Sequence, residues 1–296
     1  MTNTEKFTSS LFAAANNHWE SLNITNDFIF CKVMQDSNLL KQLIEAILNV
    51  SIDYVTYPEI QKDISIMHDA KAVRFDVYVK DSSGTVYNIE MQSVNKDNLP
   101  KRSRYYQSMI DLDMLEKGAK YSDLCSNFVI FICNFDLFGR NQAIYTFQNL
   151  CQEIPGLPLN DETFKIFINA HGNLEHINPT LKAFLEYIVH NHRSDNTFVN
   201  QVDDAVQQVK QNKEWRQEYM RGYMQDLMNR QEERFLYLFS LVRKNLNRGL
   251  TPKEILEFLE EDEKHIHQII NLIQAYPTKD NLELYTLYLN EEFPKE

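Results

Sequence analysis

Residues 72–92 read AVRFDVYVKDSSGTVYNIEMQ, and this stretch decides the fold. Its first part, residues 72–80, alternates apolar and polar side chains, which is the two-residue period of a half-buried strand. The apolar face carries Val73, Phe75, Val77 and Val79. The turn residues DSSG follow, and a second strand-like run occupies residues 86–92. The pattern predicts a β-hairpin.

The loop of this hairpin determines which residues face one another. A three-residue loop that ends at a left-handed Gly84 pairs Asp81 with Thr85. That register sets Asp76 directly opposite Glu90. A two-residue turn would separate the two acids. Gly84 favours the first register, because glycine adopts left-handed backbone conformations without steric cost.

In this register Asp76 and Glu90 form a candidate metal site. Opposed carboxylates repel each other unless a cation lies between them. Magnesium suits such a pair, because it prefers oxygen ligands, keeps several waters and leaves positions for phosphate oxygens. A bound metal also provides what phosphodiester cleavage needs, an activated water and a stabilised transition state. Gln92, on the same face, is a candidate for orienting the attacking water. A solvated sheet face would carry the same residue types, so spacing alone leaves both interpretations open.

Helices and strands alternate along the chain around this hairpin. Residues 25–49 predict two short helices, with Thr25 or Asn26 capping the first and Asp36 or Ser37 capping the second. Residues 101–117 predict a helix that ends at Gly118. Strands are expected at 127–135, 145–151 and 164–170, and a helix at 181–190.

The amino-acid composition of the chain changes near residue 200. Residues beyond this point are rich in Gln, Glu, Lys, Arg and Met at helical spacing, which predicts long, partly solvated helices and then a small helical tail. We therefore expect a core domain at 1–199 and a helical C-terminal region at 200–296. This region is a candidate for homo-oligomer formation. The acids crowded into 254–263 argue against DNA reading there.

Composition excludes several classes of protein. The net charge of −12 argues against a protein that coats nucleic acid with its whole surface, though not against one basic strip. The four cysteines are widely spaced, which predicts reduced, buried thiols and no zinc site. No run is long and apolar enough to span a membrane, and the N-terminus lacks a signal pattern. We expect a cytoplasmic protein without a membrane partner.

Four further segments carry a resemblance to a known family. They are NDFIFCKVM at 26–34, LPKRSRYYQSMIDLDMLEKGAKY at 99–121, VIFICNFDLFG at 129–139 and EWRQEYM at 214–220. Together with the E-x-Q motif that ends the hairpin, they resemble the bacterial Rpn family of recombination-promoting nucleases and transposases. The resemblance extends over roughly residues 22 to 225.

The resemblance implies a fold and a set of site residues. The fold is an α/β, restriction-endonuclease-like PD-(D/E)XK core with a central mixed sheet flanked by helices, and the cofactor is Mg²⁺, with Mn²⁺ able to substitute. Asp76 and Glu90 correspond to the metal-binding acids, and the backbone carbonyl of Met91 is a further ligand. Gln92 replaces the usual lysine and brings hydrogen bonds without charge, so activity is expected to be slow or conditional. Glu45 and Asp27 are candidates for an additional acid.

A basic strip follows the hairpin directly. Lys101, Arg102, Arg104 and Tyr105 belong to the densest basic patch of this acidic chain, and they are the expected DNA contacts. A helix with ordinary surface charges would look similar. The sequence thus predicts a magnesium-dependent DNA endonuclease associated with recombination or transposition. A non-catalytic interaction protein on the same fold, or a nuclease acting on RNA, remains an alternative.

Overall fold

The computed structural model describes residues 3–56, 58–64, 73–96, 98–115, 117–259 and 261–290. Contacts divide the chain into two compact units, Leu22–Asn212 on one hand and Met1–Ser21 with Lys213–Glu296 on the other. This division differs from the boundary expected at residue 199. The N-terminal helix α1 (Asn3–Ser21) joins the second unit because it packs on helix α7 (Lys213–Asn247), where the His18 ring stacks on Tyr223 at 4.2 Å.

A mixed six-stranded sheet forms the centre of the unit Leu22–Asn212, in the order β1-β2-β3-β4-β6-β5. The strands are β1 (Glu59–Ile64), β2 (Val73–Lys80), β3 (Val86–Gln92), β4 (Asn127–Cys133), β5 (Ile144–Phe147) and β6 (Thr163–Asn169). The pairs β3–β4 and β4–β6 are parallel, and the other neighbours are antiparallel. Residues 129–133 of β4 are fully buried, as expected of a central parallel strand covered on both faces.

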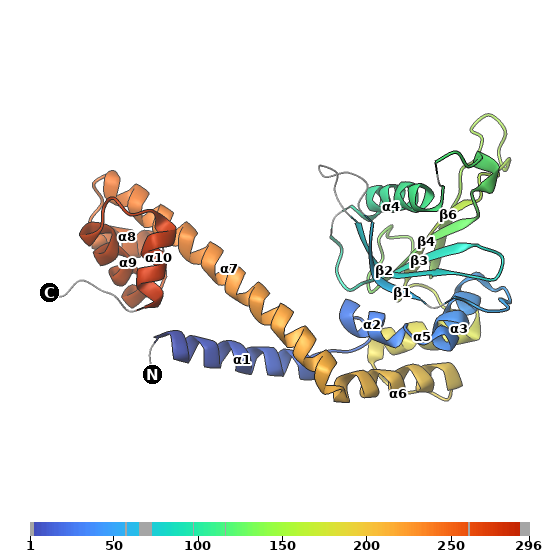
Figure 1. Cartoon of the computed structure of the whole chain (residues 1–296), viewed down its shortest axis with the longest axis horizontal. Helices are drawn as coiled ribbons and strands as arrows, with labels where there is room; N and C mark the ends of the chain where they lie inside the picture. Colours follow the sequence, from blue (N-terminus) through green and yellow to red (C-terminus); the bar gives the residue numbers. More distant parts are fainter. Residues whose placement is uncertain are drawn as a thin grey trace. The chain divides into compact units, whose positions relative to one another are not determined.

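Helices cover both faces of this sheet (Figure 1). One face carries α4 (Leu99–Met114); the other carries α2 (Asp27–Val33), α3 (Ser37–Leu48), α5 (Pro179–His190) and α6 (Thr197–Gln211). A short 3-10 helix, η1 (Tyr121–Asp123), precedes β4. The Tyr106 ring of α4 packs edge-on against Phe75 at 5.0 Å and stacks on Phe131 at 6.1 Å. The predicted α/β class, a mixed sheet flanked by helices with a helical C-terminal extension, is confirmed.

The predicted helix starts near the N-terminus of this unit are also confirmed. Asn26 caps α2 by accepting from the backbone N–H of Ile29, and Asp36 caps α3 by accepting from Asn38 and Leu39. Such caps satisfy N–H groups that have no partner within the helix. They fix the position at which α2 begins, and this position matters for the site below.

The hairpin has the register that Gly84 favoured. Gly84 has φ +86°, and the N–H of Asp81 donates to the carbonyl of Thr85 at 3.0 Å. Residues 77–80 pair with 86–89 in the predicted register. The predicted alternation along the first strand is wrong in one respect. Tyr78 packs in the same cluster as Phe75, with the two rings 5.8 Å apart, so the side-chain alternation shifts by one residue at positions 76 and 77.

Two predicted element ends are wrong by three residues or more, and the strand predicted at 127–135 ends two residues early, at Cys133. Helix α4 ends at Met114 rather than 117, because Leu115 is already extended, and Gly118 therefore does not cap it. Strand β5 ends at Phe147 rather than 151. It is the edge strand of the sheet, and the chain beyond it forms a loop closed by a bridge between Leu150 and Pro158.

The second unit is helical. Besides α1 and α7 it contains α8 (Pro252–Leu259), α9 (Glu263–Ala275) and α10 (Asn281–Leu289). Helices α7 to α10 bury an apolar cluster that includes Phe239, Ile269 and Leu284, all three fully inaccessible to solvent. Within the described part of the chain, no helix combines the length and apolar character needed to cross a bilayer.

Candidate active site

The candidate site lies where β2 and β3 separate. Their ladder runs from Lys80 and Val86 to Val77 and Ile89, and β2 then continues its pairing with β1 while β3 continues with β4. Two side chains replace the next ladder bonds. The N–H of Asp76 donates to Glu90 Oε1 at 3.1 Å, and the N–H of Met91 donates to Asp76 Oδ2 at 3.2 Å. Each acid therefore accepts a hydrogen bond from the backbone of the other strand.

The side chain of Arg102, on α4, extends to the place where β2 and β3 separate. Its Nη2 donates to Glu90 Oε2 at 2.7 Å, and its Nη1 donates to Gln92 Oε1 at 3.2 Å. Its Nε donates to the Tyr106 hydroxyl at 2.8 Å, and its guanidinium lies 5.0 Å from the Tyr106 ring centre and 5.5 Å from that of Phe131. Three hydrogen bonds and two aromatic rings therefore fix the orientation of this cation.

Gln92 links Arg102 to the backbone of β3. Its carbonyl oxygen accepts from Arg102, and its Nε2 donates to the carbonyl of Met91 at 2.9 Å. Because arginine has donors only, this contact determines which end of the amide faces Arg102. One N–H of the Gln92 amide remains for a water. The Met91 carbonyl keeps its second lone pair, which a ligand role requires.

The two acids lie in an environment that favours protonation. Glu90 is fully buried and Asp76 is partly buried. Burial raises the pKa of Asp76 well above its ordinary value, and the charges of Glu90 and Asp27 raise it further. Burial also raises the pKa of Glu90, while Arg102 and the N–H of Asp76 oppose the increase. The salt bridge from Arg102 favours the ionised form of Glu90 and opposes part of the increase that burial causes.

A pocket of about 290 Å³ opens beside Asp76. Its lining comes from the start of α2, the end of β3 and the start of α4: Thr25, Asn26, Asp27, Asp76, Met91, Gln92, Ser93, Val94, Lys96 and Arg102. Helix α2 is held against β2 by the Cys31 thiol, which donates to the carbonyl of Asp76 at 3.3 Å. This contact, together with the Asn26 cap, places Asp27 at the pocket.

The two candidates for an additional acid have different locations. Asp27 lines the pocket, whereas Glu45 does not. Glu45 accepts from the N–H of Ile52 at 2.8 Å and lies 3.8 Å from Lys41. It lines a different pocket, beside Asn49 and Asn178. The expectation that Glu45 joins the two acids is therefore wrong, because its carboxylate stabilises the chain that follows α3.

The donor set of the site fits a hard cation. Asp76, Glu90 and the Met91 carbonyl supply oxygen atoms, the ligand type that Mg²⁺ and Mn²⁺ prefer. Two mutually repelling carboxylates with raised pKa values gain from a cation between them. Among the described residues, no three His, Cys, Asp or Glu side chains converge as metal ligands. Such an ion would therefore keep several waters, as magnesium usually does.

The basic strip divides between two faces of α4. Arg102 and Tyr106, one turn apart, face the sheet, whereas Lys101, Arg104 and Tyr105 are exposed on the outer face. Sequence reasoning missed the inward role of Arg102. The signal was present, because Leu99, Tyr106 and Ile110 define the buried stripe of the helix and Arg102 lies on its edge.

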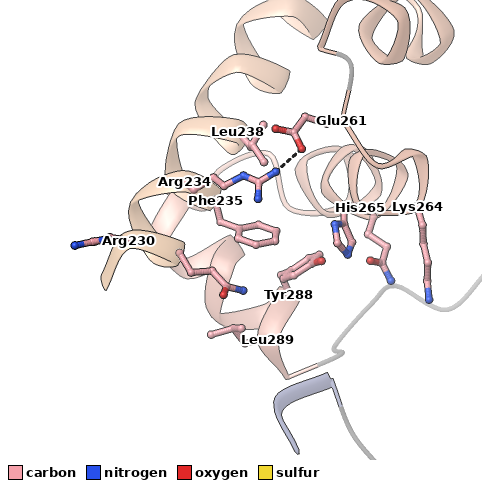
Figure 2. A pocket seen from close by; sticks show the side chains of 11 residues that line it. Arg230, Arg234, Phe235, Leu238, Glu261, Lys264, His265, Tyr288 and Leu289 are labelled. Atoms are coloured by element: carbon pink, nitrogen blue, oxygen red, sulfur yellow. Dashed lines mark hydrogen bonds and ion pairs between the residues drawn. The ribbon is translucent and has the colours of Figure 1, made fainter. Parts of the chain in front are cut away.

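A larger pocket, about 460 Å³, lies in the C-terminal unit (Figure 2). Cationic and aromatic side chains line it, including Arg230, Arg234, Phe235, Lys264, His265 and Tyr288. Of the described residues that line it, Glu261 alone is acidic, and Arg234 binds it at 2.6 Å. The smaller pocket is therefore the candidate active site, because convergent groups of suitable chemistry identify a site better than volume does.

The mixed six-stranded sheet flanked by helices defines an α/β protein, and two of its neighbouring strands diverge beside Asp76 and Glu90. The family model described as PD-(D/E)XK nuclease family transposase matches residues 24–234, and the chain belongs to this family. This confirms the classification inferred from the Rpn-like motifs. No curated protein and no solved structure matches the chain.

Proposed function

We propose that this protein is a magnesium-dependent DNA endonuclease that hydrolyses phosphodiester bonds during recombination or transposition. The observation that carries the proposal is the pair of carboxylates, Asp76 and Glu90, held in the divergence of β2 and β3 beside an open pocket. Burial raises the pKa of both acids, and the charge of Glu90 raises that of Asp76 further, so a bound cation would favour their ionised forms. An acid pair with a purely structural role would not benefit from a bound cation.

Four residues that line the pocket, Asp27, Asp76, Met91 and Gln92, have roles in this proposal, together with Glu90, which is buried next to Asp76. Asp76, Glu90 and the Met91 carbonyl would hold the metal, and Asp27, at the start of α2, would bind water beside it. A metal held there supplies positive charge to phosphate oxygens and lowers the pKa of a bound water. The remaining N–H of Gln92 orients the attacking water. Family membership supports a nuclease, and the oxygen-rich donor set supports Mg²⁺, with Mn²⁺ as a substitute.

DNA is the proposed substrate because positive charge is concentrated beside the acids. Lys96 lines the pocket, and Lys101 and Arg104 are exposed on the adjoining helix. Tyr105 is 37% exposed on that helix and offers a ring or hydroxyl contact. In a chain of net charge −12, such a local cluster directs a polyanion to one place.

The test is cleavage of supercoiled plasmid DNA in Mg²⁺, in Mn²⁺ and in EDTA. The parent should nick the plasmid only with metal, and Asp76→Ala and Glu90→Gln should reduce nicking to the EDTA level. Glu45→Gln is the matched control, because it removes a carboxylate from a different pocket and should cleave like the parent. Cleavage of RNA but not DNA would favour the RNA nuclease. Cleavage of neither would favour the interaction protein, for which the Arg102–Glu90 ion pair already neutralises one acid.

A further inference from the structure

The proposed site lacks a positive charge at the position where the family pattern has a lysine. Gln92 occupies that position and is neutral. Among the described residues that line the pocket, the cations are Lys96 and Arg102. Lys96 is exposed, whereas the Arg102 side chain is 24% exposed and bonded to both Glu90 and Gln92. Arg102 is therefore the cation with a defined position.

We propose that Arg102 is a catalytic residue, whose guanidinium stabilises the negative charge that develops on the scissile phosphate. The role that a strand lysine would have is thus carried by α4. This inference rests on the proposed nuclease function and adds a substrate-contacting group to it. Gln92 is then in part a positioning residue, because its carbonyl oxygen holds one arm of the guanidinium.

The hydrogen-bond inventory of Arg102 supports this role. A guanidinium has five N–H donors, and Arg102 uses three of them, to Glu90, Gln92 and Tyr106. Two remain, one on each terminal nitrogen. Arg102, which lines the pocket, can therefore keep its three protein partners while it donates to a phosphate oxygen. A preorganised donor of this kind stabilises a transition state more than a mobile one does.

The surroundings of Arg102 favour a phosphate contact over a purely structural ion pair. The pocket wall includes both Arg102 and Asp76, so a phosphate bound at a metal on Asp76 would lie within the same pocket. The rings of Tyr106 and Phe131 exclude water from one side of the guanidinium. Partial desolvation strengthens the interaction of the cation with an anion.

The test compares four variants with the parent: Arg102→Gln, Arg102→Lys, Gln92→Lys and the double variant Gln92→Lys/Arg102→Gln. Arg102→Gln should lower kcat for plasmid cleavage about 100-fold with KM changed less than about threefold, because the lost contact is made in the transition state. Arg102→Lys keeps the positive charge but lacks the planar guanidinium that donates to several partners at once, so its kcat should fall about tenfold. The double variant Gln92→Lys/Arg102→Gln should cleave at least about tenfold faster than Arg102→Gln alone.

Arg193→Gln is the matched control. It removes another arginine of the same unit, one that pairs with Asp203 and Asp204 far along the sequence from the site. It should cleave like the parent. Thermal unfolding of each variant separates misfolding from a catalytic defect. Should Arg102→Gln fail to fold, Arg102→Lys and its double variant with Gln92→Lys serve in its place.

The outcomes separate this inference from the proposed function. An active parent with an equally active Arg102→Gln overturns the inference alone. A slow Arg102→Gln that lysine at 92 does not rescue also overturns it, because Arg102 then only holds Glu90 and Gln92. If the parent cleaves nothing, the decisive measurement is the salt dependence of binding to a labelled duplex in Ca²⁺. A phosphate contact by Arg102 predicts a slope smaller by about 0.9 in Arg102→Gln, and an unchanged slope overturns the inference.

Discussion

Replacing Asp76 with asparagine should stabilise the metal-free protein, and more so at higher pH. The folded-state pKa of Asp76 is raised above 3.8, chiefly by burial and then by Glu90, so between the two values the folded state binds more protons than the unfolded state. The free energy of unfolding therefore falls as pH rises through this window, by about 1.4 kcal/mol for each unit. Asparagine keeps the oxygen that accepts from the N–H of Met91 and has no charge to desolvate.

We expect Asp76→Asn to exceed the parent in stability by about 1–3 kcal/mol at pH 8 in EDTA, and by much less at pH 4.5. For a unit of this size, each kcal/mol raises Tm by about 2–4 °C. The assay is denaturant and thermal unfolding at both pH values. In Mg²⁺ the advantage should shrink, because a ligand that binds the folded parent stabilises it and the variant lacks a metal-binding acid.

Asp81→Asn is the matched control, and its effect on the free energy of unfolding should have the opposite sign. Partial burial raises the pKa of Asp81, but hydrogen bonds from Ser83, Tyr87 and Thr85 outweigh burial and lower it. Its contribution to stability is present above the unfolded pKa and is lost as pH falls, so Asp81→Asn should destabilise the protein at pH 8. If Asp76→Asn is no more stable than the parent at pH 8, or shows the same difference at both pH values, the account of a desolvated Asp76 is refuted.

Three further outcomes are expected. Mn²⁺ affinity, measured by titration calorimetry, should increase with pH, because Asp76 must lose its proton to bind metal, and a pH-independent affinity would contradict the raised pKa. Lys101→Ala/Arg104→Ala should reduce the salt-dependence slope of duplex binding by about 1.8, and an unchanged slope would remove both residues from the DNA contact. Under native conditions a thiol reagent should react with Cys125 and Cys151 before Cys31 and Cys133, which are buried; equal reactivity would contradict this burial.

Local chemistry made the hairpin predictable from sequence. The register depends on Asp81 and Gly84, which lie within the loop itself. The carboxylate of Asp81 accepts from the backbone N–H of Ser83 and of Thr85, and Gly84 supplies the left-handed residue. This local chemistry fixes the ladder as far as Val77 and Ile89, one position before Asp76 and Glu90. The α2 and α3 caps were predictable for the same reason.

The elements that sequence reasoning missed depend on distant partners. Strand β1 is an edge strand of mixed polarity, and its Gln61 has φ +53°, so no clean alternation marks it. Helix α1 belongs with the C-terminal helices because of packing against α7, which begins about two thirds of the chain further on. Glu45 could not be assigned from its helix alone, since its partner is the N–H of Ile52 beyond the end of α3.

The two acids of the site are unequal, and α4 is the reason. Arg102 contacts Glu90 directly at 2.7 Å, whereas Asp76 accepts from the backbone N–H of Met91. The charges of Glu90 and Asp27 raise the pKa of Asp76 by more than the charge of Arg102 lowers it. Arg102 of α4 therefore neutralises the charge of Glu90. The charge of Asp76 has to be neutralised by what binds in the pocket. Glu90 already has a cationic partner in the metal-free protein. Asp76 is the group whose ionisation a bound cation must favour. A protein that needed only a stable hairpin would gain by replacing Asp76 with a neutral residue, so a carboxylate at this position is best explained by the ligand it prepares for.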